Sequence, residues 1–272
     1  MADVAFEAGS IKPEKRSRLF WAASDSTILI GRSLRHIFRS MDQLLAVVFQ
    51  PIMFMLLFRY VFGGAIETQG SSYVNFLVPG ILIQTAAFGA TTTAIGVCND
   101  LQRGIIDRFK SLPMLSSAVL TGHVVADLAR NTVSSIVMIG VGLIVGFRPT
   151  AGIAEWLAAF GVLLLFTLAF SWLSAILGMV AKTIEGVQWF SFVLIFPLTF
   201  ASSAFVQPQT MPAALEAFAR NQPISHIIES LRALLIGTPM GDHLVMSVVW
   251  CVGLLVVSIP LAGWLFRRHT SK

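Results

Sequence analysis

Long apolar runs separated by short polar segments are the dominant pattern of this chain. A helix needs about 20 residues to cross a hydrocarbon core of about 30 Å. The runs lack the alternating polarity of β-barrel strands, so we expect membrane-spanning helices. Six runs are long enough, and the predicted spans are 44–63, 76–98, 122–147, 153–181, 187–206 and 244–266.

Composition supports lipid as the surrounding medium. The chain has 272 residues, of which 56% are hydrophobic and 12% are charged. A soluble domain usually carries about 25% charged residues, so this chain would struggle to cover a water-facing surface. The expected fold class is therefore an all-α polytopic membrane protein.

The net charge of +5 is divided among several short segments. We therefore expect no nucleic-acid partner and read the basic residues as determinants of topology beside membrane lipids.

The distribution of Lys and Arg predicts the orientation of the spans. With the N-terminus inside, 14 of the 19 basic residues fall in inside segments and three in outside segments. This bias predicts that both termini are cytoplasmic. We expect the chain to lie in a bacterial plasma membrane. Residues 1–24 look loosely ordered and contain no apolar core of signal-peptide length. Residues 267–272 form a short cytoplasmic tail.

An amphipathic helix is predicted over residues 25–43, before the first span. Ile30, Leu34, Ile37 and Met41 would form its apolar stripe. A second stripe would hold the basic residues Arg32, Arg35 and Arg39. We expect this helix to lie in the cytoplasmic interface with its arginines at the lipid headgroups. A solvated helix is the alternative.

The inside loop 99–113 also has an amphipathic pattern. Its apolar residues Leu101, Ile105, Phe109 and Leu112 recur at helical spacing, and Pro113 ends the pattern. A short surface helix of this kind could dock to a soluble partner by its exposed face. The alternative is a helix that packs only on its own bundle.

The outside segment 207–243 contains two short helical patterns. One begins near Thr210 and the other near Ser225, and the second stops at Gly237. Both are too short to span and too apolar to lie free in water, so we expect a re-entrant hairpin in the outer leaflet. Its candidate gate residues are Pro212, Phe218, Asn221, Pro223, Glu229 and Arg232.

Catalytic, metal-binding and nucleotide-binding motifs are not found in the sequence. The dipeptide Gly-Lys does not occur, which excludes a phosphate-binding P-loop, and neither HExxH nor GxSxG is found. His226 and Glu229 form at most a poor metal pair. Cys98 and Cys251 are expected to remain free thiols. We therefore predict no catalytic, cofactor or metal site in this chain.

A few polar or small residues within the spans are expected to organise the bundle. Asp127 and Arg130 lie three residues apart in the third span, where they could offset each other's charge. The third span contains Gly142xxxGly146 and the fourth contains Ser174xxxGly178. Such spacing allows helices to approach closely.

Two longer motifs make the chain recognisable. The inside loop and the next span begin DLQRGIIDRFKSLPMLSSAVLTGHVVADLARN. The fifth span reads FPLTFASSAFV and is followed by TMP and NQPISHIIESLRALLIGTP. With six spans and a basic N-terminal helix, the chain resembles an ABC-2 type permease of the daunorubicin/doxorubicin-resistance subfamily.

The resemblance implies that this chain is the membrane-spanning half of an exporter. Such permeases form a dimer, as a homodimer or with a paralogue, and bind two copies of a separate ATPase that holds the ATP and Mg. They export hydrophobic drugs, lipids or lipid-linked glycans. A non-transporting assembly or regulatory protein is the alternative from another class. No cofactor is then expected on this chain itself.

The resemblance also implies a coupling helix that contacts the ATPase. Many family members carry a glutamate shortly before the family glycine. This chain has Leu101, Gln102 and Arg103 before Gly104 instead, so no role is assigned to that glutamate. The candidate coupling residues are Asp100, Arg103, Gly104, Asp107, Arg108, Phe109 and Pro113.

Overall fold

The computed structural model describes residues 41–63, 72–104 and 117–270. Every regular element in these ranges is a helix. The elements are α2 (Met41–Leu57), the π-helical turn η1 (Phe58–Phe62), α3 (Tyr73–Gly89), α4 (Thr91–Gln102), α6 (Ser117–Val145), α7 (Ile153–Val180), α8 (Ile184–Phe200), the 3-10 turn η2 (Pro208–Thr210), α9 (Ala213–Asn221), α10 (Pro223–Ile236) and α11 (His243–Thr270). The predicted interfacial helix, with Arg32, Arg35 and Arg39, lies outside these ranges except for its last three positions, which belong to α2.

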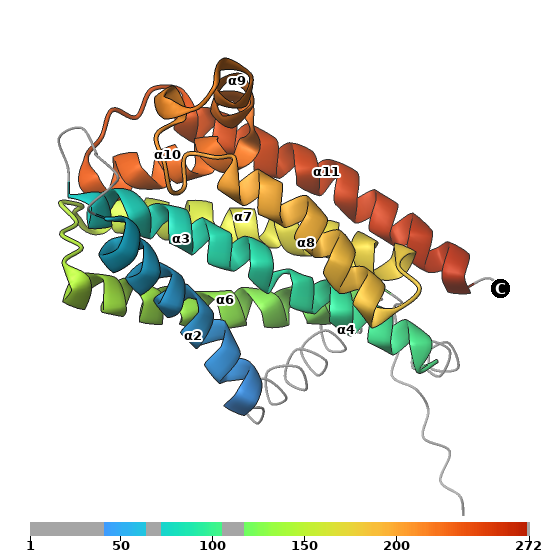
Figure 1. Ribbon diagram of the computed structural model, residues 1–272. Coiled ribbons are helices and arrows are strands. Elements are labelled where there is room, and N and C mark those ends of the chain that lie inside the picture. The colour runs from blue at the N-terminus through green and yellow to red at the C-terminus, as the bar shows by residue number, and fades with distance from the viewer. Residues whose placement is uncertain (1–40, 64–71, 105–116, 271–272) are drawn as a thin grey trace, which may run out of the picture.

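Helix α7 lies at the centre of the bundle and packs against α4, α6, α10 and α11 (Figure 1). Helix α3 joins this core through contacts with α2, α6 and α10. Figure 1 shows α9 and α10 together at one end of the bundle, which we call the α10 end. Helix α4 finishes at the opposite end, which we call the Gly104 end.

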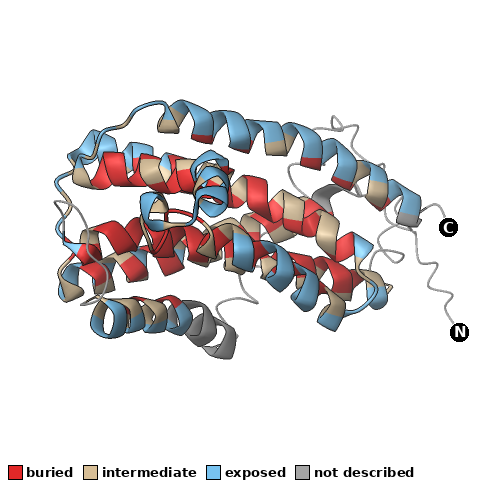
Figure 2. Cartoon of the chain, turned by 45° about the horizontal axis from the view of Figure 1, so that its top comes forward, coloured by how far each residue is buried: buried red, intermediate tan, exposed pale blue. Residues whose placement is uncertain are grey.

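Many residues on the outward faces of the bundle are exposed (Figure 2), and on α8 and α11 they include large apolar side chains. Trp189 and Phe190 on α8 are 69% and 60% exposed, and Val256 and Val257 on α11 are 66% and 65% exposed. A soluble protein rarely leaves so extensive an apolar surface uncovered. These faces fit a lipid environment, as the composition predicts.

Four helices in the described residues are long and apolar enough to cross a membrane. They are Tyr73–Gln102, Val119–Val145, Ile153–Val180 and His243–Arg268. Two shorter apolar helices, Phe49–Phe62 and Ile184–Phe200, lie where the first and fifth spans are predicted. The second predicted span is longer than expected, because α3 and α4 follow one another through Ala90, which keeps a right-handed helical conformation.

The fifth predicted span, 187–206, is too long at its end. Helix α8 stops at Phe200, and residues 201–206 form turns and bends. The Thr199 hydroxyl donates to the Ile195 backbone oxygen at 2.8 Å, and the Ser202 hydroxyl donates to the Thr199 backbone oxygen at 2.5 Å. Such side-chain bonds compete with the helical pattern. The stretch after Phe200 still contains the apolar residues Ala201, Ala204 and Phe205, so hydropathy alone places the end too late.

The two helices of segment 207–243 begin at other residues than the sequence predicts. Helix α9 begins at Ala213 rather than near Thr210, which ends the η2 turn. Helix α10 begins at Pro223 rather than near Ser225, because proline suits a first helical position that needs no N–H partner. The predicted stop at Gly237 is confirmed, since this glycine caps α10 with a φ of 72°.

The predicted Ser174xxxGly178 pattern of α7 lies at a close contact between two helices. A Cβ added to Gly178 would lie 2.3 Å from the backbone oxygen of Ala94, so α4 and α7 touch at their backbones. Gly142 faces Val78 of α3, where an added Cβ would come within 3.3 Å of that side chain. Gly146 has another role. It directly follows α6, and its φ of 116° is not helical, so the helix ends there.

Candidate functional site

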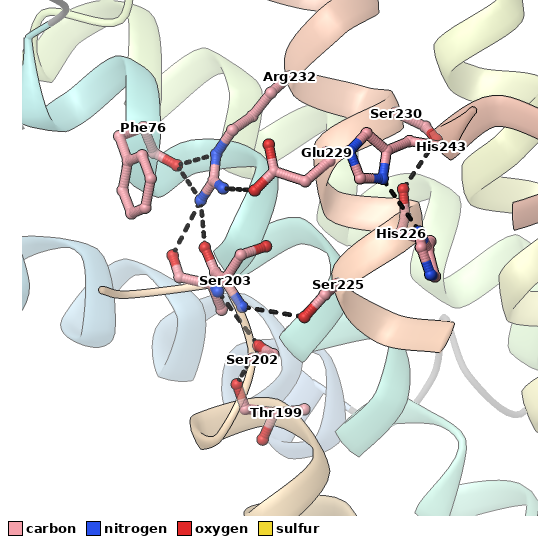
Figure 3. Close-up of polar contacts among 11 residues, drawn as sticks. Phe76, Thr199, Ser202, Ser203, Ser225, His226, Glu229, Ser230, Arg232 and His243 are labelled. Atoms are coloured by element: carbon pink, nitrogen blue, oxygen red, sulfur yellow. Dashed lines mark hydrogen bonds and ion pairs between the residues drawn. The ribbon is translucent and has the colours of Figure 1, made fainter. Parts of the chain in front are cut away.

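A buried arginine joins three segments at the α10 end (Figure 3). Arg232 on α10 is 2% exposed. Its Nε and Nη2 atoms donate to the backbone oxygen of Phe76 at 3.0 and 2.9 Å, and Nη2 also donates to the backbone oxygen of Ser203. Its guanidinium carbon lies 3.5 Å from the centre of the Phe76 ring. Arg232 therefore connects α10 to the beginning of α3 and to the turns after α8.

Glu229 balances the charge of Arg232. Arg232 Nη1 lies 2.6 Å from Glu229 Oε1, and the Glu229 side chain is 29% exposed. Burial lowers the pKa of Arg232 to about 10, while the nearby carboxylate of Glu229 acts in the opposite direction. The guanidinium therefore keeps its charge at neutral pH, and the pair remains ionic.

A cavity of about 480 Å³ lies beside this ion pair. Its wall includes Arg232, Glu229 and the polar side chains of Gln207, Gln209, Arg220, Thr238 and His243. The buried hydroxyl groups of Ser203 and Thr238 have no hydrogen-bond partner. The cavity can therefore hold water or a polar group close to the end of the bundle.

The predicted gate residues do not all meet at this cavity. Glu229 and Arg232 line it, and Pro223 forms the first turn of the helix that carries them. Pro212 caps the start of α9, and Phe218 on α9 is 46% exposed. Asn221 donates to the Ala217 backbone oxygen at 2.8 Å within α9. Reasoning from the sequence could not identify the backbone carbonyl groups of Phe76 and Ser203. Every residue has such a group, so the residue type does not show which of them accepts a hydrogen bond.

Two histidines that are far apart in sequence also meet at the α10 end. The Nδ1 atoms of His226 on α10 and His243 on α11 lie 3.0 Å apart, and the Ser230 and Ser247 hydroxyls lie 2.8 Å apart one turn further. Burial and the neighbouring His243 lower the pKa of His226, while Glu229 acts to raise it. Within the described residues, no group of three or more His, Cys, Asp or Glu could hold a metal ion. The His226–His243 and Ser230–Ser247 pairs both join α10 to α11.

A second polar cluster lies in the interior of the bundle. Asp127 on α6 is fully buried, and its carboxylate lies 3.3 Å from Arg130 Nη1, as the spacing predicts. The carboxylate also accepts from the Ser171 hydroxyl of α7 and from Asn131 Nδ2, the latter at 3.0 Å. Arg130 in turn donates to the Thr92 hydroxyl of α4. The cluster joins α4, α6 and α7 at one depth, which sequence spacing could not reveal.

The Gly104 end holds the beginning of the predicted coupling segment. Asp100 and Gln102 belong to the last turn of α4, which ends at Gln102 with Arg103 as its C-cap, and Gly104 adopts a φ of 63°. The Asp100 carboxylate lies 2.9 Å from His123 Nε2 of α6. Gln102 Nε2 donates to the Lys182 backbone oxygen at 2.8 Å. Helix α4 therefore runs without interruption from the interior cluster to this end.

The remaining coupling residues lie outside the described residues. Residues 105–116 separate α4 from α6, and this stretch includes Asp107, Arg108, Phe109 and Pro113. Asp100 is 8% exposed, so most of its surface faces His123 and the bundle. Arg103, by contrast, is exposed at the end of α4, so contact with a partner can involve Arg103 and the residues after it, and that assignment stays a prediction.

The helices, the apolar outer faces and the buried polar cluster together define a polytopic α-helical membrane protein. Family comparison gives the class more closely. The model of the family described as ABC-2 type transporter matches residues 26–236, and the chain belongs to this family. It is an ABC-2 permease, homologous to the permeases of drug-resistance exporters.

Several curated proteins are similar along almost their whole length. The daunorubicin resistance ABC transporter permease protein DrrB1 of Streptomyces coeruleorubidus is 34% identical over 251 residues, covering 89% of this chain and 88% of its own. The probable doxorubicin resistance ABC transporter permease protein DrrC of Mycobacterium tuberculosis is 27% identical over 262 residues, covering 94% and 93%. The inner membrane transport permease YadH of Escherichia coli K12 is 24% identical over 252 residues, covering 90% and 94%.

Proposed function

We propose that this permease works with a separate ATPase to export a hydrophobic drug or antibiotic from a bacterial cell. The observation that carries the proposal is the full-length similarity to a daunorubicin resistance permease at 34% identity. The ATPase binds ATP and Mg, and this chain supplies the path across the membrane. The complex contains two ATPase copies and a second permease, either identical or a paralogue. The chain crosses the plasma membrane six times, with both termini in the cytoplasm.

In this proposal, α4 transmits movement from the ATPase to the membrane interior. The ATPase contacts the segment that follows Gly104. Thr92 near the other end of α4 accepts a hydrogen bond from Arg130, and the Ala94 backbone touches Gly178 of α7. A push on the Gly104 end would therefore shift α4 against both α6 and α7. Because packed helices move as units, a small displacement of this kind could change the opening of the bundle.

The α10 end serves as the exit in this account. Arg232 holds the start of α3 and the turns after α8 against α10. These contacts keep the exit closed until the helices move apart. The neighbouring cavity provides a polar environment in which the contacts can exchange for water.

Coexpression with the cognate ATPase tests the assignment of the coupling segment. The variants Gly104→Val and Asp107→Lys should each weaken copurification and reduce drug-stimulated ATP hydrolysis. Glu155→Ala is the control, because Glu155 is an exposed residue in the first turn of α7 and lies in neither the coupling segment nor the exit cavity. If the complex and its stimulated hydrolysis both survive changes across residues 104–113, the coupling assignment is wrong. If lipid or lipid-linked glycan stimulates hydrolysis and drugs do not, the proposed cargo is wrong.

A further inference from the structure

Helix α4 makes two rows of contacts with its neighbours, and in each row the contacts recur every four residues. Residues at this spacing lie on one face of a helix. The first row, which we call the α6 row, consists of Thr92, Gly96 and Asp100 and meets Arg130 and His123 of α6. The second, the α7–α8 row, consists of Ala94, Cys98 and Gln102 and meets Gly178, Ala181 and Lys182.

The α7–α8 row is made to backbone atoms. Beyond the backbone contact at Gly178, the Cys98 thiol donates to the Ala181 backbone oxygen at 3.7 Å. One turn further, Gln102 Nε2 donates to the Lys182 backbone oxygen at 2.8 Å. Backbone atoms cannot turn away as a side chain can. This row therefore joins α4 firmly to the end of α7 and to the loop before α8.

The α6 row ends on the side chain of His123. A Cβ added to Gly96 would lie 2.9 Å from both Nδ1 and Cε1 of His123, so the imidazole ring lies directly against the α4 backbone there. One turn further along α4, His123 Nε2 donates to Asp100 Oδ2 at 2.9 Å, since a carboxylate can only accept. The two side chains are 23% and 11% exposed, so little water competes for this contact.

Two directional contacts at separate heights set how α4 lies on α6. Thr92 bonds to Arg130 at one height, and Asp100 bonds to His123 at the other. Eight residues separate the two positions on α4, which is about 12 Å along a helix. Apolar contacts at this end, such as those of Val97, have no preferred direction. The rotation and height of the last turns of α4 on α6 therefore depend on His123.

We propose that His123 is a positioning residue for coupling, which makes α6 follow the movement that α4 receives from the ATPase. This inference rests on the proposed export function. The α7–α8 row carries that movement to α7, and the His123–Asp100 contact carries it to α6. Asp100 then acts inward through His123, in agreement with its 8% exposure, and the exposed residues that follow it meet the partner.

Gly96→Ala tests the position of the ring without removing it. The new methyl group would occupy the place of the imidazole, which can turn away on its own side-chain bonds, so the ring leaves Asp100 while the fold is kept. His123→Ala removes the contact outright. His123→Gln keeps it, because the glutamine amide nitrogen can donate to Asp100 in place of Nε2. Gly140→Ala on α6 is the matched control, since an added Cβ there meets no atom within 4 Å.

Drug transported per ATP hydrolysed by the complex with its cognate ATPase is the quantity to measure. In Gly96→Ala and His123→Ala it should fall about fivefold or more, as expected when a typical coupling free energy is lost. The affinity of each variant for the ATPase should stay almost unchanged, because neither residue contacts the partner in this account. His123→Gln should recover most of the transport, and Gly140→Ala should match the wild type. Gly96→Ala should add no further loss to His123→Ala, because the ring that it displaces is already gone.

Wild-type transport per ATP in Gly96→Ala and His123→Ala would overturn the role of His123 and leave the exporter intact. A loss in His123→Gln as large as in His123→Ala, or a further loss in the double variant, would also overturn it. A wild-type complex that transports no hydrophobic drug would instead reject the proposed function. The rate of ATP hydrolysis stimulated by the permease then decides the inference: a loss in His123→Ala with recovery in His123→Gln supports it, and equal rates in all variants overturn it.

Discussion

The carboxylate of Asp127 on α6 accepts a hydrogen bond from the hydroxyl of Ser171 on α7, 44 residues further along the chain. The same carboxylate faces Arg130, which also bonds to Thr92 of α4. Asp127 therefore holds the point at which three helices meet. In the proposed mechanism, movement of α4 passes through this point.

Removal of the Asp127 carboxylate should destabilise the bundle strongly. Asp127→Ala leaves the Arg130 guanidinium, which is 12% exposed, without its ionic partner. Breaking a buried pair from one side typically costs about 3–5 kcal/mol. The midpoint of thermal unfolding in detergent should fall clearly. Glu155→Ala, at an exposed residue in the first turn of α7, should lower stability by less than about 1 kcal/mol. Equal effects of the two substitutions would contradict a structural role for the cluster.

Replacement of Arg232 by lysine should weaken the closure of the α10 end even though the charge is kept. Lysine lacks the planar fork that reaches the Phe76 and Ser203 carbonyl groups together. At least one buried acceptor would then lose its partner, at a cost of about 1–3 kcal/mol. Thermal unfolding of Arg232→Lys should show this loss. The exposed pair of Arg220 and Glu216 provides the control, since Arg220→Lys should be nearly silent.

Close packing of α4 against α7 should make Gly178 intolerant of a side chain. In Gly178→Ala, the new methyl group would lie 2.3 Å from the Ala94 backbone oxygen unless the helices separate. We expect a loss of about 1–3 kcal/mol, typical of overpacking. Gly161→Ala on the same helix is the matched control, because an added Cβ there meets no atom within 4 Å. That control should be neutral or stabilising by up to about 1 kcal/mol. If Gly178→Ala were as stable as the wild-type chain, the two helices could separate without an energetic cost.

Acidification should weaken the α10–α11 contact at His226. Burial and His243 lower the pKa of His226 in the folded chain below its ordinary value of 6.5. The unfolded chain therefore binds a proton at a higher pH than the folded chain does, so stability is present above about pH 6.5 and declines as the pH falls below it. Unfolding midpoints measured from pH 7.5 to 5.5 should decline. The decline should be shallower in His226→Gln, and an unchanged slope would show that His226 does not contribute.

The sequence predicted the helices better than the contacts between them. Long apolar runs mark helices in lipid, so all six predicted runs coincide largely with observed helices. The end of α8 was placed wrongly because Ala204 and Phe205 are as apolar as a span but are buried in non-helical turns. Hydropathy reports the medium around a residue and not its backbone conformation.

The candidate site could be predicted only where both partners lie on one helix. The Asp127–Arg130 and Glu229–Arg232 contacts both join residues three apart, a spacing visible in the sequence. Ser171, Phe76 and His243 reach their partners through tertiary packing, and no local pattern marks them.

Transport in inside-out membrane vesicles tests the central claim most directly. Vesicles containing this chain and its cognate ATPase should accumulate a hydrophobic drug when ATP is supplied. Accumulation should stop with a non-hydrolysable ATP analogue or when either chain is omitted. ATP-dependent accumulation that is the same with and without this chain would contradict its assignment as the permease of the exporter.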